Sequence, residues 1–183
     1  VWKKLREVGV LPSDVAGDTA LLRRAYLDII GRLPTPDESR AYLADNSADK
    51  FSRLVDTLLA RPEYADYWAN KWCDLLRPNS FHVGQKATLN FDAWIRDAFR
   101  RNMPYDQFVR ELLTAQGSTW TNGATVMFRD RRKPDDLTTM VSQLFLGVRL
   151  ECAKCHHHPF EVYGQDEFYG FAAYFDRLGF KGT

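Results

Sequence analysis

Two cysteines and a histidine near the C-terminal end of the chain have a spacing that supports metal and cofactor chemistry. Cys152, Cys155 and His156 form a Cys-x-x-Cys-His sequence, and His157 and His158 follow directly. Two thiols three residues apart can add to the two vinyl groups of a porphyrin, while the adjacent imidazole binds the iron. The spacing therefore predicts covalently attached haem c, with His156 as the proximal iron ligand.

Other uses of the same residues stay open. A zinc site could take Cys152, Cys155 and one or two of the three histidines, but zinc sites usually gather a second ligand pair at a distance. Among the cysteines and histidines of the sequence, only Cys73 and His82 lie outside the motif and could form such a pair. A thioredoxin-type dithiol would need a βαβ context, which the sequence lacks. In the remaining alternative the cysteines are incidental and the histidines are solvated.

The distal side of the iron has no obvious ligand in the sequence. His156 and His158 are two residues apart, so they cannot easily reach opposite faces of one porphyrin. We expect His158 to hydrogen-bond near the site and to orient the motif. The candidates for the distal ligand are His82 and Met127, besides another residue, water or a neighbouring domain.

A haem-dependent, peroxidase-like enzyme is an alternative to electron transfer. Such an enzyme needs a base and a cationic group that polarise the peroxide O–O bond, and His82 with Arg129 or Arg131 could supply them. Nothing in the spacing of these residues requires this role. We therefore expect an electron-transfer module and no self-sufficient enzyme, and we assign no catalytic residue.

The elements that position these residues are helices along the whole chain. Apolar side chains recur with a 3.6-residue period in residues 18–30, 51–59, 64–77, 94–99, 104–113, 134–148 and 168–175. Asp18 is a candidate cap of the first of these segments and Gly31 its stop, and Thr35 to Glu38 form a capping box. Residues 78–89 and 116–132 read as loops. No alternating strand of useful length appears, so we predict a single all-α, bundle-like domain over residues 1–183 with a late Cys-x-x-Cys-His turn.

Composition gives no reason to expect nucleic acid or an anionic membrane as the partner. The 183 residues carry 25 Lys plus Arg against 24 Asp plus Glu, a formal charge of +1, which gives no electrostatic reason to expect nucleic acid. No run approaches the ~20 apolar residues of a membrane span. The chain begins at Val1 without a signal-peptide pattern, so we expect a mature product or a domain excised from a larger multidomain protein.

Several blocks in order resemble the planctomycete cytochrome-associated domain of unknown function. They are residues 21–28 with Gly31 and 34–36, then 54–72, 102–113, 143–160 and 165–175. The resemblance implies a secreted or periplasmic multidomain protein, in which this domain lies between a cytochrome c-like domain and a second domain of unknown function. It also implies a neighbouring cytochrome-like domain or a redox protein as partner. The family sequence Cys-x-x-Cys-His-x-His-Pro carries over onto Cys152, Cys155, His156, His158 and Pro159.

Overall fold

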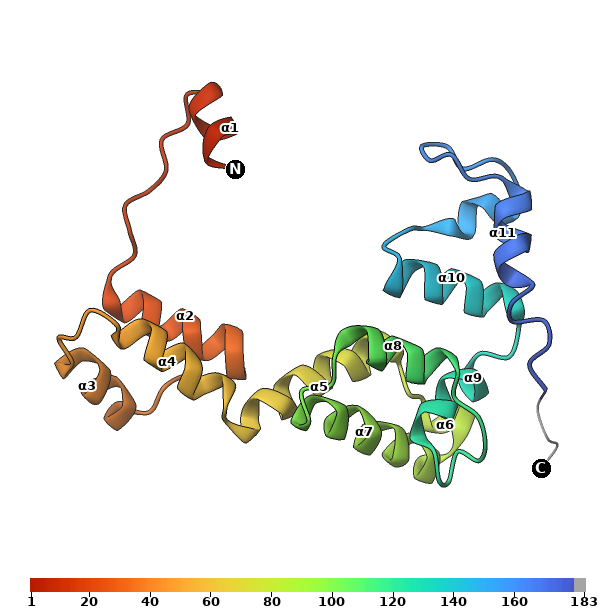
Figure 1. Cartoon of the computed structure of the whole chain (residues 1–183), viewed down its shortest axis with the longest axis horizontal. Helices are drawn as coiled ribbons and strands as arrows, with labels where there is room; N and C mark the ends of the chain where they lie inside the picture. The colour runs from red at the N-terminus through yellow and green to blue at the C-terminus, as the bar shows by residue number, and fades with distance from the viewer. Residues whose placement is uncertain (180–183) are drawn as a thin grey trace. The chain divides into compact units, whose positions relative to one another are not determined.

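The computed structural model describes residues 1–179, and all regular secondary structure in this part of the chain is helical (Figure 1). Eleven α-helices and two short 3₁₀ helices follow one another, and residues 1–179 contain no strand. The all-α prediction is therefore confirmed. The helices are α1 (Trp2–Glu7), α2 (Asp18–Ile30), α3 (Pro36–Ala44), α4 (Lys50–Leu59), α5 (Pro62–Leu76), α6 (Ser80–Val83), α7 (Gln85–Arg100), α8 (Tyr105–Leu113), η1 (Gly123–Thr125), α9 (Val126–Asp130), α10 (Pro134–Phe145), η2 (Leu150–Lys154) and α11 (Gln165–Ala172).

The chain divides into two compact units, Val1–Tyr67 and the part from Trp68 onward, and the boundary falls inside helix α5. The core of the first unit consists of buried side chains from α2, α3 and α4. They are Leu22, Ala25, Tyr26, Ile30, Tyr42 and Leu58. Each unit has a hydrophobic core of its own. The single, bundle-like domain over residues 1–183 stays a prediction.

Helix ends in the first unit follow the signals in the sequence. Thr35 Oγ1 accepts a hydrogen bond from the Glu38 N–H (3.2 Å), and the Glu38 carboxylate accepts one from the Thr35 N–H (2.7 Å). This reciprocal pair satisfies N–H groups that the first turn of a helix leaves without partners. Gly31 ends α2 at φ 70°, as expected. Asp18 is not the cap of α2; Gly17 is, and Asp18 is the first helical residue, 2.7 Å from the Lys50 ammonium.

The second unit has a larger core, formed by side chains of α5 to α10. Phe91, Ile95 and Leu112 from α7 and α8 are among its fully buried members, and Met127 and Leu137 join them from α9 and α10. A smaller cluster, made of Leu150, Ala153 and Phe168, holds η2 against α11. The Cys-x-x-Cys-His sequence lies on this smaller cluster.

Two segments that the sequence predicts to be loops contain helix. Residues 78–89 include α6 and the first turn of α7, separated by Gly84 at φ 85°. Asn79 caps α6 by accepting a hydrogen bond from the Phe81 N–H (2.9 Å), and Val83 and Ala87 turn inward to the core. Residues 116–132 include η1 and α9. These helices of three to five residues are too short to display a 3.6-residue period, so tertiary burial stabilises them and periodicity does not reveal them.

No helix in residues 1–179 is both long enough and apolar enough to cross a lipid bilayer.

Candidate functional site

The Cys-x-x-Cys-His sequence occupies the end of η2 and the turn that follows it. The backbone N–H groups of Cys155 and His156 both donate to the carbonyl oxygen of Cys152, and each nitrogen–oxygen distance is 3.4 Å. Cys152, Cys155 and His156 are all exposed, and both thiols are free. The side chains that carry the predicted chemistry are therefore accessible from solvent.

The residues between the two cysteines attach this turn to the second unit. Ala153 is completely buried beside Leu150 and Phe168. Lys154 directs its ammonium to Asp135 Oδ2 at 2.8 Å, in the first turn of α10. This hydrogen bond and the negative charge of Asp135 raise the pKa of Lys154. The turn is thus held by one buried side chain and one ion pair.

Helix α11 holds the same turn from its other side. The carbonyl oxygen of Lys154 accepts hydrogen bonds from Gln165 Nε2 (3.1 Å) and from the Tyr169 hydroxyl (3.3 Å). Helix α11 begins with Glu167 accepting a hydrogen bond from the Gly164 N–H at 2.8 Å, which lowers the pKa of Glu167. Packing and polar contacts therefore fix η2 between α10 and α11.

The imidazole of His156 has a defined hydrogen-bond partner on one nitrogen. Its Nδ1 lies 2.7 Å from the carbonyl oxygen of His157. Because a carbonyl only accepts, Nδ1 must carry the hydrogen, and in the neutral ring the lone pair is then on Nε2. Metal-binding histidines in proteins commonly have this arrangement, in which the second nitrogen donates to a carbonyl or carboxylate.

His158 organises the loop after the motif. Its Nδ1 accepts hydrogen bonds from the backbone N–H groups of Phe160 (3.2 Å) and Glu161 (3.0 Å). The backbone N–H of His158 donates to the carbonyl oxygen of Tyr163 (2.8 Å). With Nδ1 as acceptor, the neutral ring carries its hydrogen on Nε2, the opposite tautomer to His156. These contacts are with backbone groups of the loop, and the orientation of the motif by His158 stays a prediction.

The two candidates for a distal ligand have surroundings that differ from those of the Cys-x-x-Cys-His motif. Met127 is only 1% exposed, within the large core of the second unit. His82 is on α6, and its Nδ1 lies 3.0 Å from Asp130 Oδ1. Neither residue shares a hydrogen bond or a hydrophobic cluster with the motif in the described part of the chain. Their role as ligands stays a prediction.

The remaining cysteine lies in a different kind of environment. Burial raises the pKa of Cys73 to about 12, and the hydrogen bond from its thiol to Asp92 Oδ1 (3.4 Å) adds to this effect. A thiol in this state is a poor nucleophile and a poor metal ligand near neutral pH. Within residues 1–179, no group of three or more His, Cys, Asp or Glu side chains is arranged to hold a metal ion.

Sequence reasoning misses the contacts that anchor the motif. A carboxylate at the start of a helix is accounted for by the helix dipole alone, so the sequence gives no sign that Asp135 pairs with Lys154. Asp135 does lie in the first turn of α10. Its pairing with a lysine 19 positions later depends on how the chain folds back, which no local pattern indicates.

Fold and site together define a protein that is all-helical over residues 1–179 and whose Cys-x-x-Cys-His sequence comes after ten α-helices. The chain belongs to the family described as PSCyt2, protein of unknown function (DUF1549), whose family model matches residues 1–179. This is a planctomycete cytochrome-associated domain, so the resemblance found from the sequence blocks is confirmed, and the family is associated with cytochrome-containing multidomain proteins. No curated protein and no solved structure matches the chain.

Proposed function

We propose that this chain binds haem c covalently through Cys152 and Cys155, with His156 as the proximal iron ligand, and that it transfers electrons. The observation that supports this most directly is the hydrogen bond from His156 Nδ1 to His157 O at 2.7 Å. It leaves Nε2 as the nitrogen that can bind a metal, next to two free and exposed thiols.

The donor set present fits haem better than it fits zinc. Haem c would need two thiols from this sequence to attach the porphyrin and one imidazole to bind the iron. A structural zinc ion needs four converging protein ligands, whereas residues 1–179 contain no converging group of even three. One imidazole and two thiols therefore meet what the Cys-x-x-Cys-His sequence would have to supply for haem c, whereas a structural zinc ion would need a fourth ligand.

Apolar side chains near the motif are also suited to a large, flat, apolar group. Phe160 and Val162, in the loop that His158 organises, are each 92% exposed. When an apolar ligand covers such side chains, the apolar surface removed from water stabilises the complex by roughly 25 cal/mol per Å². This loop is the part of the described chain that we expect to cover a bound porphyrin.

Haem would supply an iron that changes oxidation state by one electron. The two thiols would each add across one vinyl group, with the sulfur bonding one carbon and the hydrogen passing to the other, so that no oxidant or reductant is consumed. A cofactor held by three surface residues would be accessible to a redox partner. The association of the family with cytochrome-containing proteins supports such a partner, either a neighbouring cytochrome-like domain or a separate redox protein.

This function implies a location outside the cytoplasm. Thioether attachment of haem is completed there, so we propose a periplasmic or secreted protein. Fusion of the chain to an export signal should be required for attachment in a host with a cytochrome c maturation system.

The test is production of the full chain with an export signal and this maturation system. Intact mass after acid extraction and a visible spectrum of the denatured protein should show one haem that stays attached. Cys152→Ser or Cys155→Ser should weaken attachment, and the double variant should abolish it. Cys73→Ser is the matched control and should keep full attachment.

Other outcomes would contradict the proposal in distinguishable ways. Complete loss of haem on acid extraction would exclude covalent binding. A haem-free protein whose Tm drops on chelation would indicate a zinc-stabilised module on the same residues. Rapid turnover of peroxide that is lost in His82→Gln would indicate a peroxidase-like enzyme and contradict electron transfer as the function.

A further inference from the structure

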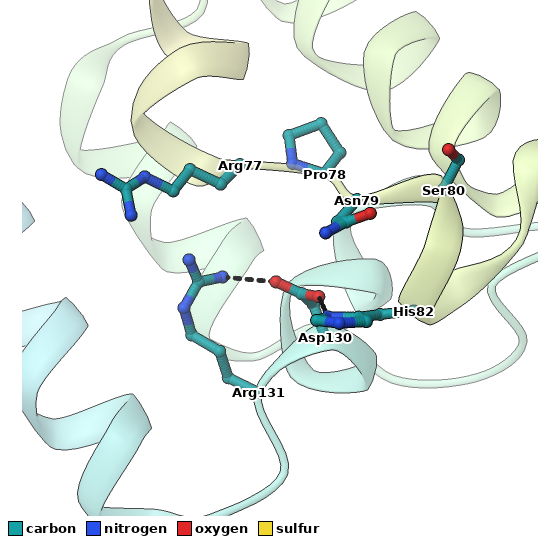
Figure 2. A pocket seen from close by; sticks show the side chains of 7 residues that line it. All are labelled: Arg77, Pro78, Asn79, Ser80, His82, Asp130 and Arg131. Carbon is teal, nitrogen blue, oxygen red and sulfur yellow. Dashed lines mark hydrogen bonds and ion pairs between the residues drawn. The ribbon is translucent and has the colours of Figure 1, made fainter.

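A second group of polar side chains lines an open pocket of about 480 Å³ in the second unit. The pocket lies where α5 ends, α6 begins and α9 ends (Figure 2). Two arginines, Arg77 and Arg131, contribute to its wall together with Asn79, His82 and Asp130. None of these residues belongs to the Cys-x-x-Cys-His motif.

The single carboxylate in this wall is already bound on both of its oxygens. Asp130 Oδ2 accepts a hydrogen bond from Arg131 Nη1 at 3.0 Å, and Asp130 Oδ1 lies 3.0 Å from His82 Nδ1. The carboxylate side chain is 11% exposed. Arg131 Nη1 also donates to the carbonyl of Leu76 at 3.3 Å. Asp130 is therefore engaged by two neighbours and does not neutralise a third group.

Arg77 adds a positive charge that nothing in the wall compensates. Its guanidinium makes no hydrogen bond or ion pair with the residues that the structure describes, and in Figure 2 it extends to the same side of the view as the Arg131 guanidinium. Arg131 has further N–H donors besides the Nη1 group that is in use. The pocket thus presents guanidinium donors and an excess of positive charge.

The backbone of Arg77 is strained where α5 ends. Its φ is 51°, in the left-handed region, which costs a residue with a side chain roughly 1–2 kcal/mol. Arg77 also precedes Pro78, and a residue in that position normally takes an extended conformation. Arg77 directly follows α5 and its N–H donates to the carbonyl of Cys73 (2.7 Å), and glycine would take this helix-ending conformation without the strain.

We propose that this pocket binds a small molecule that carries a carboxylate or phosphate group, and that Arg77 and Arg131 hold the anionic oxygens. Guanidinium groups are suited to this because their paired N–H donors match two oxygens of either group. A volume of about 480 Å³ accommodates an organic acid or a phosphate ester, and more than a single inorganic ion. This proposal uses no residue of the haem-binding motif and stands independently of it.

The test is titration of the full chain with inorganic phosphate, succinate and glucose 6-phosphate, followed by calorimetry and amide NMR shifts. We expect saturable binding with shifts around residues 77–82 and 130–131. Arg77→Gln should weaken binding by about ten-fold or more, the usual effect of losing one charge-assisted hydrogen bond. The control is Arg110→Gln, which removes an exposed arginine of α8 outside the pocket and should leave affinity unchanged.

Arg77→Gly separates a role in binding from a role in structure. It should raise Tm by about 2–4 °C by removing the strain while it weakens binding as much as Arg77→Gln does. Tighter binding of succinate than of phosphate would indicate a carboxylate ligand, and the reverse a phosphate ester. Equal losses in Arg77→Gln and Arg110→Gln, or no saturable binding of any probe, would overturn the proposal.

Discussion

Lys154 Nζ lies 2.8 Å from Asp135 Oδ2 and so links the middle of the Cys-x-x-Cys sequence to the first turn of α10. The lysine carbonyl is held at the same time by Gln165 and Tyr169 of α11. One residue between the two cysteines therefore contacts both helices that flank the turn. This contact fixes the two thiols relative to the rest of the second unit.

Removing the ion pair should loosen the turn without unfolding the protein. In Asp135→Asn we expect faster amide hydrogen exchange in residues 150–156 and less complete attachment of haem, because the turn then depends on Ala153 and α11 alone. The control is Asp136→Asn, which removes the neighbouring acid of the same helical turn and the same favourable interaction with the helix dipole. If both variants exchange at the wild-type rate, the ion pair does not hold the turn.

The three cysteines should differ in reactivity in the haem-free protein. At pH 8 we expect iodoacetamide to modify Cys152 and Cys155, which are exposed, and to leave Cys73 unmodified. Burial and the hydrogen bond to Asp92 raise the pKa of Cys73 to about 12, so almost no thiolate is present there. Peptide mass spectrometry after a timed reaction measures this.

Substitution of Asp92 provides the complementary experiment. Asp92→Asn removes the negative charge that accepts the hydrogen bond from the Cys73 thiol, and it should increase labelling of Cys73 moderately, because burial still opposes the thiolate. If Cys73 of the wild-type protein were labelled as fast as Cys152, this would contradict the buried environment of Cys73.

His158 should determine the order of the loop that follows the motif. His158→Ala removes the acceptor of two backbone hydrogen bonds, and loss of about 1 kcal/mol for each corresponds to roughly five-fold faster exchange at Phe160 and Glu161. His158→Asn retains a side-chain acceptor and should restore part of the protection. The control is His157→Ala, whose exposed side chain makes no contact with these two amides. Unchanged exchange in His158→Ala would show that the loop is ordered by other contacts.

Long helices are predictable from this sequence because their apolar periods exceed two turns and their ends carry local signals. The capping pair Thr35 and Glu38, the stop at Gly31 and the start at Pro134 are examples, and each is decided by residues within four positions. Helices α6 and α9 are not predictable in this way. They have four and five residues, and Val83 and Met127 are buried by partners distant in sequence.

The same distinction applies to the sites. Cys152, Cys155 and His156 are found from the sequence because their spacing is itself the signal. The pocket of Arg77 and Arg131 is not found, because these two residues are 54 positions apart in the sequence. The positive φ of Arg77 is likewise a backbone property that no residue pattern reveals.

Glu38 should make the first unit sensitive to acid. Its carboxylate accepts hydrogen bonds from Arg32 on both oxygens (3.1 Å each), from Arg61 (2.7 Å) and from the Thr35 N–H (2.7 Å). The hydrogen bonds from the Arg32 guanidinium, chiefly, hold the pKa of Glu38 well below its usual range. We expect Glu38→Gln to lower the free energy of unfolding by about 1–2 kcal/mol at pH 7, measured by urea denaturation.

The pH dependence of this difference follows from the direction of the shift. Because the pKa is lower in the folded than in the unfolded chain, the contribution of the carboxylate is complete above the unfolded value of about 4.3 and declines as the pH falls below it. The stability of wild type should therefore approach that of Glu38→Gln between pH 5 and pH 2. Asp37→Asn is the control, since Asp37 is 90% exposed and pairs only with the exposed Arg40, so its effect should stay below about 0.5 kcal/mol. A difference between wild type and Glu38→Gln that stays constant or widens on acidification would show that the charge of Glu38 does not stabilise this unit.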